Sequence, residues 1–566
     1  MEVREEKTDL LIIGAGGAGL RAAIEAAQTS TKLRILLLNR GPIGKSGLTS
    51  MANGGMQWVF HPDDSTEAHF RDTVRLGCFL NDQDLVEVLV EEAPRRAEEL
   101  LFWGAGVVRE YGEKRGTVEV TSPPRGQLIP GVTFMRTLKK RCARYENVRI
   151  LEDTIVSKLF LQGRRVAGAL ALDIRRGEPF VIRAKAVVLA TGGLGEIFQH
   201  TTNAPFGLRG YAAGSGYTLA LLAGAELIDM EMVQFTGMQL APDWLLGNPM
   251  LLSALCGGRY VNARGEEFLS LPQPRDTIQR LALKEIREGR GTERGGVFID
   301  LSRSHLSKEE IEERLRTSLG GPFARERWRL IKRMSKKMPD PKTWKLEFAP
   351  GGAHFSMGGV RINERCETTV EGLFAAGEVA GGVHGANRMG GNALSEIIVF
   401  GARAGRFASA YAEGSEMPRL DRGMVREDLD TLFWFFRQEG IPPFSLRQTI
   451  GSIMDRHMGV VREEQGLREA LKELEIIKEK ALYLKVPPIR AFNLSWAEAI
   501  EVLLMVPLAE AMIRSALLRQ ESRGAHFRED FPHADGRWVK HVRVRLENGT
   551  MSLDAVPVVI KRIQPG

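Results

Sequence analysis

Cysteine is scarce in this 566-residue sequence, and its spacing excludes several kinds of site. The sequence contains four cysteines, at positions 78, 142, 256 and 366, and none of them forms a C-x-x-C pair. Closely spaced cysteines are what iron–sulfur clusters and structural zinc sites usually require. We therefore expect neither site within this chain alone, and the scattered thiols favour a reducing compartment.

Long apolar runs are missing as well. The first seven residues lead into a predicted strand without the apolar core of a signal peptide. The most apolar late segment, 500–518, contains Glu501, Glu510 and Arg514, so we expect a packed helix and not a membrane span. These features predict a cytoplasmic protein that contacts a membrane only through other subunits.

No long basic tract is present, although the net charge is +7, from 78 basic and 71 acidic residues. Basic and acidic side chains alternate, as in segment 308–314, which is typical of a solvated surface. Nucleic acid is therefore not an expected partner.

A glycine-rich turn near the start is the first positive signal. The apolar run 10–13 is followed by Gly14, Gly16, Gly17 and Gly19, and then by a helical stretch, 20–27. In such a strand–turn–helix, the first glycine permits the turn, the next ones let the backbone approach a pyrophosphate, and the last permits close packing of helix and strand. This pattern predicts a dinucleotide site.

Two later strands, 186–190 and 372–376, also run into glycine turns. Three such turns suit one extended cofactor lying across a sheet, as FAD does, although the later two could also be ordinary turns. The strand 34–38 ends in Asn39 and Arg40, where many dinucleotide folds have an acid on the ribose. An asparagine can still bond a ribose hydroxyl.

The sequence changes character along its length. Residues 1–235 and 350–405 mix strands, helices and glycine turns, and predict one discontinuous cofactor domain of Rossmann-like α/β class. The interruption, 236–349, predicts an inserted cap. Residues 406–520 have helical periodicity, and 521–566 predict a small C-terminal domain with short strands.

Several segments resemble one family. Segments 521–532 and 538–541 are similar to the C-terminal signature of succinate dehydrogenase and fumarate reductase flavoprotein subunits. Segment 384–394 is similar to that family's substrate and flavin loop, and further matches are 354–359, 274–276, 53–55 and 201–204. L-aspartate oxidase and the α-subunit of adenylylsulfate reductase are more distant relatives.

The resemblance implies an FAD-dependent oxidoreductase with an iron–sulfur partner subunit and a small carboxylate substrate. It implies that Arg388 and His354, with His384 nearby, bind the substrate and that Arg275 transfers a proton to it. Together with the glycine turns, the expected FAD contacts are Gly14, Gly16, Gly17, Gly19, Asn39, Arg40, Ser46, Thr49, Asn53, Gly54, Gly55, Thr191, Gly192, Asn203, Ser215, Glu378, Asn392 and Leu394.

Some positions depart from the family pattern. The histidine to which many succinate dehydrogenases attach FAD is replaced by Leu48, so we expect noncovalent FAD. A carboxylate-binding histidine is replaced by Thr236, and Ala254 and Cys256 stand where the family's proton-relay arginine and glutamate are expected. An insertion that shifts this alignment is the other explanation.

Three functions therefore stay open. The first is the catalytic subunit of a fumarate reductase or succinate dehydrogenase-type complex. The second is a flavoprotein of the same fold with another substrate, resembling aspartate oxidase or a sulfur-compound reductase. The third is an electron-transfer flavoprotein that no longer turns over a dicarboxylate.

Overall fold

The fold is known from a computed structural model. It describes residues 4–52, 55–106, 109–111, 125–203, 211–241, 253, 256–271, 273–318, 329, 333 and 340–565.

The largest described sheet has seven strands, built around the parallel pair β1 (Arg4–Ile13) and β9 (Glu178–Leu189). Its order is β6-β2-β1-β9-β8-β7, and β16 pairs with β9. The other bounds are β2 (Ile35–Leu38), β6 (Val148–Leu151), β7 (Thr154–Gln162), β8 (Arg165–Asp173) and β16 (Leu373–Ala375). The run Leu10–Ile13 is buried, as the centre of a covered parallel sheet requires.

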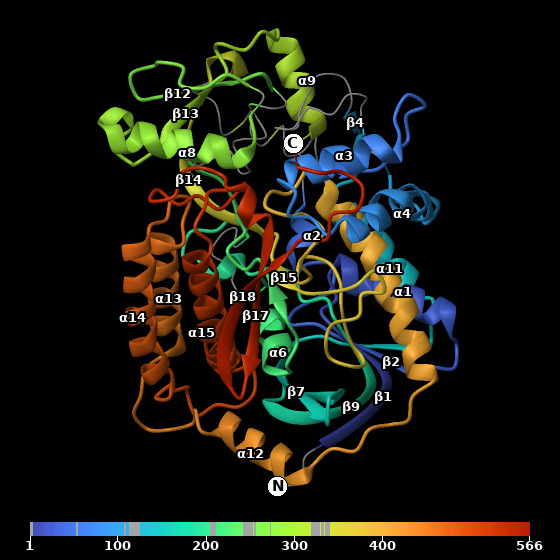
Figure 1. The fold of residues 1–566 in the computed structure, drawn as a ribbon. Coiled ribbons are helices and arrows are strands. Elements are labelled where there is room, and N and C mark those ends of the chain that lie inside the picture. Colours follow the sequence, from blue (N-terminus) through green and yellow to red (C-terminus); the bar gives the residue numbers. More distant parts are fainter. Residues whose placement is uncertain are drawn as a thin grey trace.

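Two long helices pack against each other beside this sheet: α1 (Gly17–Thr29) and α11 (Asn392–Glu413) (Figure 1). Their close approach depends on Gly405, since a Cβ atom there would lie 2.2 Å from the carbonyl oxygen of Ala22. The remaining helices of this region are α2 (Leu48–Met51), α3 (Thr66–Leu76), α4 (Gln83–Phe102), α5 (Gly131–Cys142), the 3₁₀ turn η1 (Gly195–Ile197) and α6 (Ser215–Leu222). A small sheet joins β3 (Gly55–Gln57), β5 (Gly126–Leu128) and β4 (Arg109–Tyr111).

The upper part of the molecule in Figure 1 has its own sheet and apolar core. Its strand order is β11-β14-β13-β12. The bounds are β11 (Val233–Ala241), β12 (Arg259–Val261), β13 (Val297–Asp300) and β14 (Lys345–Ser356). Helix α8 (Arg275–Glu285), the π-helical turn η3 (Ile286–Arg290), α9 (Lys308–Ser318) and the 3₁₀ turn η5 (Pro341–Thr343) complete it. This core packs around Tyr260, Trp344 and Phe348.

The C-terminal part is mostly helical. It contains α12 (Arg422–Phe433), α13 (Pro443–His457), α14 (Glu464–Ala481) and α15 (Leu494–Leu518). A mixed group follows, with the 3₁₀ turn η6 (Gly536–Trp538) and the hairpin β17 (Lys540–Glu547) and β18 (Thr550–Pro557). This hairpin extends a sheet that begins with β15 (Gly359–Val360) and β10 (Leu227–Ile228).

The cofactor and upper regions are joined by strands that cross the predicted domain boundaries. β11 spans the predicted boundary after residue 235, and β14 spans the one after residue 349. The four domain ranges therefore stay predictions. The predicted fold class is confirmed, with a parallel-sheet α/β region followed by helices and a small strand-containing end.

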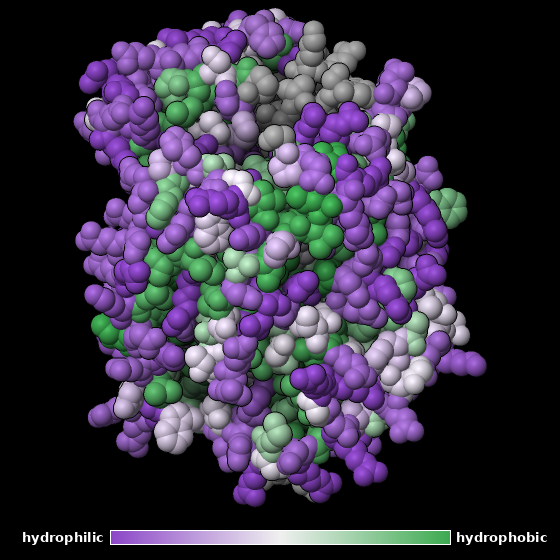
Figure 2. All heavy atoms as spheres, in the orientation of Figure 1, coloured by the Kyte–Doolittle hydropathy of each residue, from purple (hydrophilic) through white to green (hydrophobic). Residues whose placement is uncertain are grey.

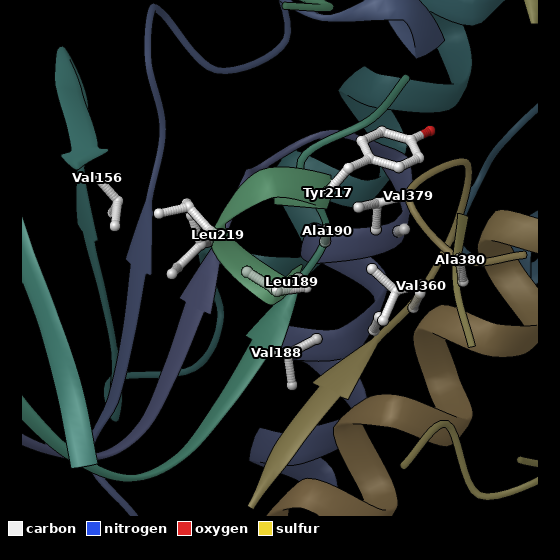
Figure 3. Close-up of a cluster of buried hydrophobic side chains, with 14 of the residues drawn as sticks. Val156, Val188, Leu189, Ala190, Tyr217, Leu219, Val360, Val379 and Ala380 are labelled. Atoms are coloured by element: carbon white, nitrogen blue, oxygen red, sulfur yellow. The ribbon is translucent and has the colours of Figure 1, made fainter. Parts of the chain in front are cut away.

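Side chains from distant segments fill the space beside β9. Val188, Leu189 and Ala190 lie near Leu219 of α6, and Val360 of β15 approaches from the other side (Figure 3). On the face in Figure 2, apolar residues gather in the middle, below the more hydrophilic upper part. Within the described ranges, no helix is long and apolar enough to cross a membrane.

Candidate functional site

A groove opens at the carboxyl ends of β1, β2 and β9, where ligands of open α/β sheets usually bind. It encloses about 1040 Å³ of empty space, its open mouth included. Eleven of the predicted FAD contacts line it: Gly14, Gly16, Gly17, Asn39, Arg40, Ser46, Thr49, Thr191, Gly192, Ser215 and Glu378. Leu48 lines it too.

The first glycine turn is packed too tightly for side chains at two positions. Gly14 has a φ of +104°, and a Cβ atom there would lie 2.2 Å from the carbonyl oxygen of Ala190. A Cβ atom on Gly19 would lie 1.7 Å from the carbonyl oxygen of Gly14. Gly19 is therefore needed for helix packing and does not line the groove.

Gly16 has a different environment. Among the described residues, the only neighbour within 4 Å of a Cβ atom built there is the hydroxyl oxygen of Thr49, at 3.9 Å. Gly16 is the N-cap of α1, and the first turn of this helix contains no acidic residue. The positive end of the helix dipole thus faces the groove uncompensated, as a pyrophosphate site requires.

The side chain of Asn39 braces the glycine turn. Its Oδ1 accepts a hydrogen bond of 2.9 Å from the backbone amide of Ala15. Its Nδ2 donates to the carbonyl oxygen of Gly41 and to the hydroxyl of Ser46. Both ends of the side chain are therefore engaged within the protein.

One acidic residue of the groove lining comes from the C-terminal helix α15. Glu501 of α15 lines the groove, and its Oε1 lies 2.9 Å from Nε of Arg40. Its Oε2 lies 2.8 Å from Arg447 of α13. Although burial raises the pKa of Glu501, the two guanidinium groups hold it below its usual value. Sequence reasoning missed this residue because it lies in an apolar helical segment.

Glu378, which follows β16, also lines the groove. The amide of Ser356 donates to its Oε1 at 3.1 Å, and Tyr217 donates to its carbonyl oxygen at 2.6 Å. Burial raises the pKa of Glu378 to about 8, with Arg388 acting in the opposite direction. This carboxyl group is therefore protonated at neutral pH and can donate a hydrogen bond.

The residues present fit FAD. The backbone at Gly16 is open toward the groove, because among the described residues a Cβ atom built there would meet only the Thr49 hydroxyl, at 3.9 Å. A pyrophosphate can therefore approach the backbone amides at the start of α1. Apolar walls suited to rings come from Ile155, Val156 and Leu219, which sequence reasoning did not single out because their β-branched or leucine runs look like ordinary core.

Other predicted contacts lie away from the groove lining: Gly55, Asn203, Asn392 and Leu394. Both ends of the Asn392 side chain are used, by His69 at 2.9 Å and by Thr73 at 3.0 Å. Asn53 and Gly54 lie outside the described residues, as does Ala254.

A second cluster lies close enough to Glu378 for the charge of its Arg388 to lower the pKa of that carboxyl group. Its centre is Gln234, a buried residue of β11. The Oε1 of Gln234 accepts hydrogen bonds from Arg275 at 3.2 Å and from Arg388 at 2.9 Å. Two guanidinium groups from α8 and from the 381–391 loop thus converge on one neutral oxygen. Sequence reasoning did not assign Gln234 a role.

His354 belongs to the same cluster. Its Nδ1 lies 2.8 Å from the hydroxyl of Thr202. Burial lowers the pKa of His354 well below its usual value, and the nearby charges of Arg275 and Arg388 lower it further. The imidazole is therefore neutral at physiological pH.

His384, the other predicted catalytic histidine, lies behind this cluster. Its Nε2 is 3.0 Å from Oε2 of Glu396, and both side chains are buried. The His384 ring packs edge-on against Phe355, which also contacts the guanidinium of Arg388, 4.4 Å from the ring centroid. The Phe355 ring thus lies between His384 and Arg388.

Two of the departures from the family pattern, Thr236 and Cys256, occupy buried positions. Thr236 is fully buried in β11, opposite Gly352 of β14. Cys256 is fully buried in the upper apolar core, next to Tyr260 and Ile299. The thiol therefore belongs to a packed core.

Two family models match this chain. The FAD binding domain model matches residues 9–394, and the fumarate reductase flavoprotein C-terminal model matches residues 447–566. A CoM/CoB fumarate reductase chain of Methanothermobacter marburgensis is 37% identical over 96% of this chain and 98% of its own length. The fumarate reductase flavoprotein subunit of Escherichia coli K12 is 31% identical over 99% and 95%.

Solved structures of two reductases have a similar fold. A mutant quinol fumarate reductase chain of Escherichia coli has a TM-score of 0.86 at 30% identity, covering 100% of this chain and 98% of that one. Adenylylsulfate reductase from Archaeoglobus fulgidus has a TM-score of 0.82 at 21% identity, covering 99% and 97%. At that identity, the second likeness shows a shared fold.

Proposed function

This chain is an FAD-dependent oxidoreductase and belongs to the fumarate reductase flavoprotein family. We propose that it is the FAD-binding catalytic subunit of a fumarate reductase- or succinate dehydrogenase-type complex. Its substrate in this proposal is a small carboxylate. The observation that carries the proposal is the convergence of Arg275 and Arg388 on Gln234, beside a groove that fits FAD.

The cluster has the groups that the reaction needs. Bound FAD supplies hydride transfer to or from the substrate carbon. Arg388 and neutral His354 donate hydrogen bonds to the substrate carboxylate and stabilise the negative charge that develops on it. Arg275, at the first turn of α8, holds the proton that is delivered to the adjacent carbon.

The groove contacts divide between the two halves of the cofactor. Gly14, Gly16 and Gly17 hold the pyrophosphate, and Arg40 with Glu501 lies at the adenosine end. In this proposal Thr49, Ser215 and Glu378 contact the flavin half of FAD. Leu48 lines the groove where an attachment histidine would stand, so FAD is bound noncovalently in this proposal.

Electrons reach the flavin through a partner in this proposal. The four cysteines lie far apart in the sequence, and a separate iron–sulfur subunit supplies the clusters. Any membrane contact is made by other subunits, with the catalytic chain on the cytoplasmic side.

Fumarate-dependent oxidation of reduced methyl viologen by the flavinated protein tests the catalytic proposal. We expect viologen oxidation that saturates with fumarate and is competitively inhibited by malonate. A yellow, folded protein that shows no fumarate-dependent oxidation would contradict it. Copurification with a cysteine-rich protein from the native source tests the partner.

A different substrate on the same fold is the second candidate. It is favoured by Thr236 and Cys256, which replace residues that the family uses for binding and proton relay. Oxidation of L-aspartate by oxygen, with no second subunit, would support an aspartate oxidase-like enzyme. Reduction of a sulfur compound would support a reductase of that class, and an inert flavin would indicate an electron carrier.

A further inference from the structure

We propose that Gln234 is the positioning residue of this site: it holds the guanidinium groups of Arg275 and Arg388 together with a neutral oxygen, and so leaves their positive charge available for an anionic substrate. This inference rests on the proposed function, since it assigns the substrate pair to Arg275 and Arg388.

The hydrogen bonds of Gln234 fix its amide in one orientation. Oε1 accepts from both arginines, while Nε2 donates to Oδ1 of Asn387 at 2.9 Å and to the carbonyl oxygen of Arg388 at 3.1 Å. Guanidinium groups only donate, and carbonyl oxygens only accept. A flipped amide would therefore lose every one of these bonds, so the acceptor oxygen must face the arginines.

The segments that Gln234 joins are far apart in the sequence. Arg275 begins α8, Gln234 lies on β11, and Asn387 and Arg388 lie in the loop before α11. Asn387 continues the chain of bonds by donating to Oδ1 of Asp276 at 3.1 Å. The start of α8 is thus tied to this loop through Gln234 and Asn387.

Neutrality of the acceptor is the decisive property. Two like charges that converge on one oxygen repel each other, and a dipole lowers this cost without cancelling the charge. His354 is neutral and the carboxyl group of Glu378 is protonated near pH 7, so neither of these neighbours contributes a full charge. A glutamate in place of Gln234 would instead form a buried ion pair with both arginines.

Two substitutions separate this role from a packing role. Gln234→Glu keeps the shape and adds a negative charge, whereas Gln234→Leu keeps the approximate volume and removes the acceptor. Gln83→Glu is the control, because Gln83 is also buried but its amide binds the backbone of residues 561–563. Malonate is the probe, titrated into the FAD-loaded protein by its effect on the flavin absorbance.

We expect Gln234→Glu to weaken malonate binding by at least about 30-fold, and Gln234→Leu to change it by less than about 3-fold. In Gln234→Leu, kcat should fall by about 10-fold or more with little change in KM, because Arg275 loses its orientation. Gln83→Glu should match the parent protein. Equal losses of malonate binding in both Gln234 variants would show a packing role and overturn the inference.

A readout that needs no substrate separates this inference from the proposed function. Phenylglyoxal reacts with accessible guanidinium groups, and peptide mass spectrometry reports the labelling of Arg275 and Arg388. Arg275 should be labelled several-fold faster in Gln234→Leu than in the parent protein, and Arg388 less so, because Phe355 and the carbonyl oxygen of Met389 also contact it. Unchanged labelling would overturn the positioning role, whereas faster labelling in a protein that turns over no carboxylate would contradict only the proposed function.

Discussion

The guanidinium of Arg40 and the carboxylate of Glu501 form an ion pair at 2.9 Å, although 461 positions separate them in the sequence. The pair lies at the groove, and Arg447 contacts the other carboxylate oxygen of Glu501 at 2.8 Å. Arg447 in turn reaches Glu196, whose Oε1 accepts from the backbone amide of Tyr211. The C-terminal helices are thereby bonded to the wall of the cofactor groove.

Replacing Glu501 by alanine should therefore reduce both stability and FAD retention. Arg40, whose side chain is 25% exposed, would lose this carboxylate, whereas Arg447 would keep Glu196 and Glu498, so we expect a cost of about 1–3 kcal/mol of unfolding free energy. Glu510→Ala on the same helix is the matched control, because the side chain of its partner Arg514 is 42% exposed and the expected cost is about 0–1 kcal/mol. Denaturant unfolding and FAD titration of the apoprotein measure the two effects. Equal losses in the two variants would contradict a special role of Glu501.

Gly19→Ala should reduce the stability of the fold, whereas Gly16→Ala should reduce the affinity for FAD. Gly19→Ala places a methyl group against the Gly14 carbonyl oxygen, so we expect a loss of about 3 kcal/mol in unfolding free energy. Gly16 has φ −71° and ψ −165°, which alanine adopts, and its Cβ atom would meet only the groove. Gly16→Ala should thus fold normally and bind FAD at least about 30-fold more weakly.

Gly106→Ala is the control for both glycine variants, because no heavy atom of the described residues lies within 4 Å of a Cβ atom built there. Thermal unfolding of the apoproteins and FAD titration give the comparison. Normal FAD affinity in Gly16→Ala would show that the pyrophosphate does not approach this turn.

Glu378 should make the apoprotein less stable as the pH rises. Its pKa is about 8 in the folded protein and 4.5 in an ordinary glutamate, so the folded state binds the extra proton between these values. The stabilisation by this group is fully present below pH 4.5 and is lost as the pH rises through 8. Glu378→Gln removes this dependence. The difference in Tm between Glu378→Gln and the parent apoprotein should therefore increase from pH 5 to pH 9, and a constant difference would contradict the raised pKa.

Arg275→Lys should abolish turnover while FAD stays bound. A lysine ammonium group lacks the planar fork that bonds Gln234 and faces the substrate at once, so we expect kcat to fall by about 100-fold or more. Arg280→Lys, five residues further along α8, is the control because Arg280 donates hydrogen bonds to Asp276 and Thr277. Steady-state viologen assays and the flavin content measure both variants. An unchanged rate in Arg275→Lys would show that Arg275 is not the proton donor.

Acid precipitation tests noncovalent attachment. Leu48 has no atom that could bond covalently to the flavin, so the pellet should be colourless and all FAD should stay in the supernatant. Absorbance of both fractions at the flavin bands gives the result. Yellow colour in a washed pellet would contradict the expectation.

The sequence by itself determined the strand, turn and helix at the start of the chain, and the expectation that they bind a dinucleotide. A β-branched run followed by Gly14, Gly16 and Gly19 predicts a strand, a turn and a helix from local geometry alone, and β1 and α1 formed there. The family resemblance identified Arg275, His354 and Arg388 as a group, because it spans motifs in every part of the chain. These signals depend on residue type and short spacing, which a sequence displays directly.

Only the tertiary structure decided which side chains meet. It engaged Asn39 in bracing the turn, brought Glu501 to the groove from a distant helix, and placed Phe355 between His384 and Arg388. It also put Gln234 between two arginines that lie 41 and 154 positions away. Such contacts depend on how strands, helices and loops pack in three dimensions, and the local pattern of a sequence contains no record of that packing.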